Sequence, residues 1–144
     1  GQYDKDNQAN IGRNYWAAEP VAAFSYIDPF GPNMDIKLMY DFNAKNPATH
    51  YRSGQEAHAD YDLGWGMGNG WVVGIGGYIY HQVTDDRQDG DRVNDNKGRA
   101  FAIGPSIKYN SASGWFVTAK WQQESDVRNR PEGSAYWLKL TYPL

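Results

Sequence analysis

The sequence contains no cysteine and little leucine. Of its 144 residues none is Cys and five are Leu, whereas 6 are Trp, 11 Tyr, 5 Phe and 16 Gly. Without cysteine the chain has no disulfides, no cysteine-ligated zinc or iron–sulfur site and no thiol catalysis. A helical domain is normally rich in leucine, and abundant Tyr, Trp and Gly favour β-structure instead.

Long apolar runs and basic clusters are absent as well. Mean hydropathy is -0.78, and no run approaches the roughly 18 apolar residues that a transmembrane helix requires. A transmembrane β-barrel remains open, because its strands alternate polar and apolar residues and are hydrophilic on average. The net charge is -3, so we expect no nucleic-acid partner.

Apolar and polar residues alternate with a period of two along most of the chain. In the segment 99–110, for example, Phe101, Ile103 and Ile107 share one face, and the opposite face carries small or polar residues. Such alternation predicts β-strands, and long helical periodicity is not seen. Seven strands are predicted, at residues 14–27, 34–43, 55–67, 71–84, 99–110, 115–128 and 135–144.

The strand lengths and the connections favour a membrane barrel. These strands are longer than the roughly five or six residues typical of soluble sheets, and they are long enough to cross a bilayer when tilted. Short turns at 28–33, 68–70 and 111–114 alternate with longer polar segments, the longest being 85–98. Periplasmic turns and extracellular loops alternate in this way in outer-membrane barrels. We therefore predict an all-β, up-and-down antiparallel transmembrane β-barrel, with residues 1–144 in one domain.

The C-terminal strand and the odd strand number indicate part of a larger barrel. Alternate positions near the end hold Tyr136, Leu138, Leu140, Tyr142 and Leu144. This pattern is typical of the signal read by the barrel-assembly machinery, although that signal usually ends in Phe, and a soluble edge strand could share the pattern. Seven strands place residues 1–13 in an extracellular loop and predict that this is the C-terminal portion of a longer barrel. Pairing of two copies or a miscounted strand are the alternatives.

Several long stretches resemble a known family. They are IGRNYWAAEP at 11–20, NPATHYRSG at 46–54, GPSIKY at 104–109, GWFVTAKWQQE at 114–124 and AYWLKLTYPL at 135–144. The chain resembles the meta-pathway phenol-degradation outer-membrane proteins, or SphA-like transporters, over about residues 11–144. The resemblance implies a bacterial outer-membrane location, a role in uptake of hydrophobic, often aromatic, compounds, and a missing N-terminal half. It transfers no established site residue.

If the apolar faces meet lipid, the polar faces line a lumen. Both signs of charge occur there. These side chains could form a salt-bridged network that plugs the interior, or they could produce the transverse electric field of a water-filled pore. Trp137 could stack on an aromatic solute or fill space. The candidate lumen-lining residues are His58, Asp60, Asp62, Lys120, Glu124, Trp137 and Lys139.

Two groups of residues invite a metal interpretation. His58, Asp60 and Asp62 share one strand face and could bind a divalent metal or tune a proton shuttle, but a single strand offers poor tetrahedral geometry. The acidic loop 85–96 has Arg87 and Asn96 where an EF-hand needs an oxygen ligand and a Glu. We predict a solvated extracellular loop, and no metal or other cofactor.

We predict a channel without catalytic activity, because none of the serines lies in a G-x-S-x-G turn. It would take up small hydrophobic or aromatic compounds by passive diffusion. Its partners would be outer-membrane lipid and lipopolysaccharide, the solute, and the barrel-assembly machinery through the C-terminal strand. The alternatives are a soluble or surface β-barrel or sandwich that binds a ligand, and a β-structural protein that self-associates through open edges into dimers or fibres.

Overall fold

The computed structural model describes residues 14–143, in which all regular structure is β-strand. The predicted extracellular segment 1–13 and the terminal Leu144 lie outside the described residues. In the part that is described, no helix has the length and apolar character needed to cross a membrane.

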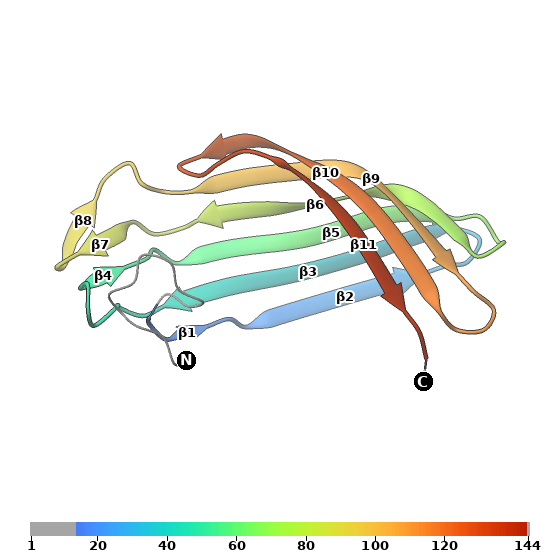
Figure 1. Cartoon of the computed structure of the whole chain (residues 1–144), viewed down its shortest axis with the longest axis horizontal. Coiled ribbons are helices and arrows are strands. Elements are labelled where there is room, and N and C mark those ends of the chain that lie inside the picture. The colour runs from blue at the N-terminus through green and yellow to red at the C-terminus, as the bar shows by residue number, and fades with distance from the viewer. Residues whose placement is uncertain (1–13, 144) are drawn as a thin grey trace.

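The main sheet is an eight-stranded antiparallel meander (Figure 1). β1 and β2 both pair with β3, and each later strand of this sheet pairs with the one before it, in the order β3, β5, β6, β9, β10, β11. The all-β prediction and the antiparallel arrangement are therefore confirmed. The strands are β1 (Ala17–Ala18), β2 (Val21–Ile27), β3 (Pro32–Asn43), β5 (Glu56–Gly66), β6 (Trp71–Gln82), β9 (Arg99–Asn110), β10 (Phe116–Arg128) and β11 (Ser134–Thr141).

Prolines explain where the observed strands depart from the predicted ones. The first predicted strand is divided at Pro20 into β1 and β2, because proline has no N–H to donate to the ladder. The last strand ends at Thr141, two residues before Pro143. β3 begins at Pro32, earlier than predicted, where a strand tolerates proline as its first residue.

The long connections hold a second sheet, which the sequence did not predict. β4 (Tyr51–Arg52), β7 (Asp86–Gln88) and β8 (Asp91–Val93) form a three-stranded antiparallel sheet. This small sheet gathers at the end of the molecule opposite the short turns (Figure 1). The predicted solvated loop 85–98 therefore contains an ordered hairpin.

The main sheet curves strongly but does not close. β10 and β11 cross steeply over the other strands in Figure 1. Asp62 on β5 forms an ion pair with Lys120 on β10, although β6 and β9 lie between them in the sheet. Within residues 14–143, β2 pairs only with β3 and β11 only with β10, which leaves an open sheet with two edges.

The two faces of the sheet differ in character. The convex face carries large apolar side chains that remain exposed, such as Leu138 at 78%, Trp65 at 58% and Ile75 at 45%. The concave face carries the charged residues predicted to share one side. Among the described residues, the only buried apolar side chains are Met39, Ala100 and Ala102. Residues 14–143 therefore form no apolar core of the kind that stabilises a soluble sandwich.

Candidate functional site

The curvature of the main sheet creates a cavity of about 760 Å³ on its concave face. Its lining comes from β2, β3 and β5 on one side and from β9, β10 and β11 on the other, with β6 between them. Five of the seven candidate lumen residues line this single cavity. They are Asp60, Asp62, Lys120, Trp137 and Lys139. Whether the cavity is part of a lumen depends on closure of the sheet, so that role stays a prediction.

Asp62 connects the two walls of the cavity. It pairs with Lys120, and its Oδ1 accepts a hydrogen bond from Ser106 Oγ at 3.0 Å. Gly76 lies opposite Asp62 on β6, and a Cβ added there would come within 2.9 Å of Asp62 Oδ2. The glycine therefore leaves the space through which the Asp62 side chain reaches across the sheet.

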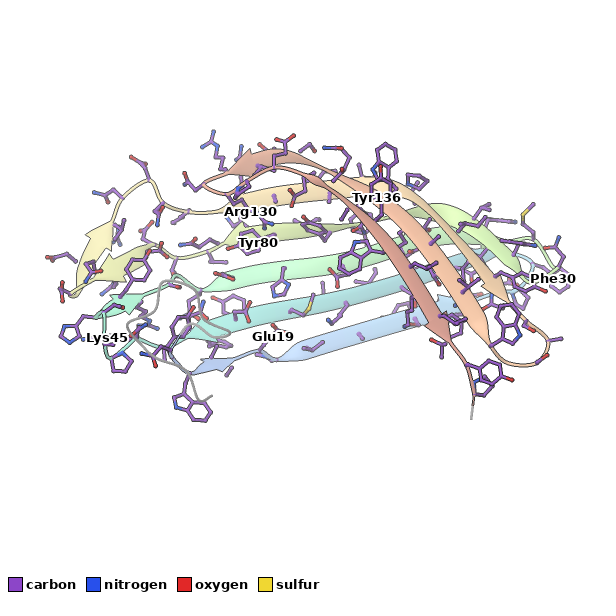
Figure 2. All side chains as sticks on the ribbon, in the orientation of Figure 1. Glu19, Phe30, Lys45, Tyr80, Arg130 and Tyr136 are labelled. Carbon is purple, nitrogen blue, oxygen red and sulfur yellow. The ribbon has the colours of Figure 1, made fainter. Side chains whose placement is uncertain are left out.

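Glu124 belongs to a second group of contacts near the loop end. It accepts hydrogen bonds from Tyr78 Oη and from the backbone N–H of Gly133, the latter at 2.7 Å. Arg130 forms an ion pair with the same carboxylate at 3.2 Å and lies 5.2 Å from the ring centre of Tyr80 (Figure 2). These contacts fasten the β10–β11 connection to β6, which favours a positioning role for Glu124.

His58 has different partners from those the sequence suggested. His58 shares its strand with Asp60 and Asp62, but its Nε2 lies 3.0 Å from Asp41 Oδ2 and 3.8 Å from Glu19 Oε2. One ligand atom from each of His58, Asp41 and Glu19 lies within 4.8 Å of the other two. An imidazole with two carboxylates is chemically able to hold a divalent cation. The sequence could not find this set, since its members lie on three separate strands or connections.

Lys139 lies in a row on the concave face with two residues outside the candidate set, Lys108 and Thr118. Lys108, Thr118 and Lys139 are in register across β9, β10 and β11. Nζ of Lys108 and Nζ of Lys139 lie 4.8 and 5.5 Å from the ring centre of Phe116. Strand alternation places Phe116 on the polar face with Thr118. This pattern was the signal in the sequence from which the row could have been found.

The loop end is organised around one buried carboxylate, Asp86. Its Oδ1 accepts from Gly54 N and Gln82 Nε2, both at 2.7 Å, and its Oδ2 accepts from Tyr51 Oη and from Asn96 Nδ2. These four donors use the acceptor sites that a calcium ion would need. Burial of the phenol and its hydrogen bond to Asp86 raise the pKa of Tyr51 to about 12.

Comparison with known proteins gives one finding. A family profile described as "Putative MetA-pathway of phenol degradation" matches residues 1–140. No curated protein and no solved structure matches the chain. The profile spans nearly all 144 residues. The chain, whose curved sheet carries a charged concave face, therefore belongs to the MetA-pathway phenol-degradation family.

Proposed function

We propose that the chain forms part of the wall of an outer-membrane β-barrel channel through which small hydrophobic or aromatic compounds diffuse into the bacterial cell. The carrying observation is the exposed apolar convex face, over which no second layer packs within the described residues. In water such an extended apolar surface is unfavourable and marks an interface, whereas lipid would cover it along its whole length.

The distribution of charge supports the same proposal. Charged side chains of the main strands gather on the concave face, where Asp62 and Lys120 pair across the cavity. A charge on the lipid-facing side would cost about 2–4 kcal/mol near the midplane of the membrane. A water-filled interior accommodates both signs of charge and lets a solute pass by diffusion, with no coupling to an energy source.

Aromatic side chains gather on the convex face near the short turns, where a membrane interface would lie. The ring centres of Trp71 and Tyr109 are 4.9 Å apart, and those of Tyr109 and Trp115 are 5.5 Å apart. Aromatic girdles at this level are typical of transmembrane barrels. This cluster would place the short turns at one membrane interface, and their shortness favours the periplasmic side.

Closure of the barrel requires partners for both open edges. The free edges of β2 and β11 each present unpaired backbone groups within the described part of the chain, and such groups are not tolerated in lipid. Further strands of a longer polypeptide would close the wall, and two copies of the chain are the alternative. The C-terminal strand β11 would be the segment recognised by the barrel-assembly machinery.

A soluble ligand-binding protein is the principal alternative function. It would place apolar side chains inside and polar ones outside, and the described sheet has the opposite arrangement, with Leu138 and Leu140 exposed on the convex face. The cavity on the concave face is the one observation that favours it. This alternative predicts a protein that remains in solution without detergent.

Gel migration of the native, detergent-extracted protein tests the channel proposal directly. We expect the unboiled sample to run faster than the boiled one, because a closed barrel stays folded in detergent until it is heated. Extraction by high salt without detergent, together with identical migration before and after boiling, would contradict the proposal. A sample denatured in urea and not refolded is the control for the migration of the unfolded chain.

A further inference from the structure

The in-register row of Lys108, Thr118 and Lys139 is the most unusual feature of the cavity. Adjacent strands are about 4.8 Å apart, so the two lysine Cα atoms lie on either side of Thr118 and about 10 Å from each other. Lysine side chains are long enough to converge over that distance. Two ammonium groups and a hydroxyl are thus brought together on one patch of the cavity wall.

Both ammonium groups lie close to the ring of Phe116. Lys108 Nζ and Lys139 Nζ lie 4.8 and 5.5 Å from its centre, which is within the range of a cation–π interaction. Two like charges that share one ring repel each other. An anion that binds between them would relieve this repulsion and accept hydrogen bonds from both ammonium groups and from the Thr118 hydroxyl.

The neighbouring lysine shows what distinguishes this row. Lys120, one row further along β10, pairs with Asp62. Within residues 14–143, by contrast, neither Lys108 nor Lys139 has a carboxylate oxygen within 4.0 Å. The positive charge of Lys120 is therefore neutralised inside the protein, and that of the Lys108–Lys139 pair is available to a solute.

Aromatic and apolar surface adjoins the two cations. Trp137 is in register with Lys120, in the row next to Lys139, and it lines the same cavity as Phe116, Ile27 and Val72. A planar ring that rests against Trp137 and Phe116 would gain stacking energy as well as apolar contact. The opposite wall of the cavity carries Asp35, Lys37 and Asp60, so its net negative charge would orient a carboxylate towards β9–β11.

We propose that Lys108, Thr118 and Lys139, together with Phe116 and Trp137, form a binding site for a one-ring aromatic carboxylate. The use of this site in uptake rests on the proposed channel function, whereas binding itself requires only the concave face. The site would make aromatic anions preferred solutes over neutral aromatic compounds of the same size. It would also distinguish them from aliphatic carboxylates, which cannot stack.

Isothermal titration of the full-length protein in detergent micelles with sodium benzoate tests the site. We expect benzoate to bind more tightly than benzyl alcohol, which lacks the charge, and more tightly than cyclohexanecarboxylate, which lacks the aromatic ring. Affinity should fall as salt concentration rises, because the contact is ionic. Equal affinity for benzoate and benzyl alcohol, or no binding of benzoate, would overturn the proposal.

Matched variants locate the binding. Lys108→Met and Lys139→Met should each weaken benzoate binding roughly tenfold, equivalent to about 1.4 kcal/mol, and Lys139→Arg should retain most of the affinity. Lys45→Met removes the same charge from an exposed loop position (Figure 2) and should leave binding unchanged. Equal effects of Lys45→Met and Lys139→Met would show a nonspecific charge effect and overturn the site.

Trp137→Leu separates the aromatic contact from the ionic one. It should reduce the preference for benzoate over cyclohexanecarboxylate, with little effect on the salt dependence. The gel assay of the channel gives an independent result. Heat-shifted migration without benzoate binding would refute only this site, and benzoate binding by a detergent-independent, soluble protein would refute only the channel.

Discussion

The two faces of the main sheet come from the same strands but differ in how their side chains are covered and paired. On the convex face, Ile75 lies between Leu63 and Pro105 in register and remains 45% exposed. On the concave face, Asp62 directly precedes Leu63 in the chain, and its carboxylate contacts Lys120 and Ser106. The uncovered apolar groups and the paired polar groups support the proposal that lipid covers the convex side.

The largest effect is expected from a charge placed on the convex face. Ile75→Lys should lower the free energy of unfolding in lipid vesicles by about 2–4 kcal/mol, since lipid near the midplane excludes an ammonium group. Denaturant titration monitored by tryptophan fluorescence measures this.

Ala23→Lys is the matched control for that substitution. Ala23 lies on β2, lines the cavity and is exposed, so the same charge would face the aqueous interior and change stability by less than about 0.5 kcal/mol. If both variants proved equally stable, the convex face would be in water and the comparison between the two faces would fail.

A smaller effect is expected from breaking the ion pair on the concave face. The Asp62 and Lys120 side chains are 21% and 28% exposed, so the pair lies between a surface pair and a buried one. We expect Asp62→Asn to destabilise the protein by about 1–2 kcal/mol. A double-mutant cycle with Lys120→Gln measures the coupling energy.

Asp60→Asn is the control for the ion pair. It makes the same chemical change two residues away on the same strand face, where the structure gives the carboxylate no ion pair within residues 14–143. We expect almost no change in stability. A coupling energy near zero between Asp62 and Lys120 would show that water screens the pair fully.

The smallest effect at neutral pH concerns the loop end, where neither face of the main sheet is involved. Tyr51→Phe removes one hydrogen bond to Asp86 and should cost about 0.5–1.5 kcal/mol at pH 7. Because the folded state raises the pKa of Tyr51 from 10.0 to about 12, its contribution is complete below pH 10 and is lost as the pH rises towards 12.

Thermal unfolding monitored between pH 9 and pH 12 checks this sign. The stability of the wild type should fall more steeply with pH than that of Tyr51→Phe, so that the difference between them shrinks above pH 10. Parallel curves across this range would contradict the assigned environment of Tyr51.

The sequence alone determined which residues share a face. A period of two along each strand placed Asp60, Asp62, Lys120 and Lys139 on one side, because successive side chains of an extended strand point in opposite directions. It also located the long strands to within a few residues and separated short turns from long connections. It did not predict the break in the first strand at Pro20, because the alternation of side chains does not reveal the loss of one backbone hydrogen bond.

Only the tertiary structure decided which of those residues meet. Curvature brought Asp62 to Lys120 across two intervening strands, and it needed Gly76 to leave room. Strand register placed Lys108 and Lys139 at the ring of Phe116. It also made Asp41, and not Asp60, the ion-pair partner of His58. Periodicity fixes the direction of a side chain, whereas its partners depend on register and curvature, which arise from contacts between residues far apart in the chain.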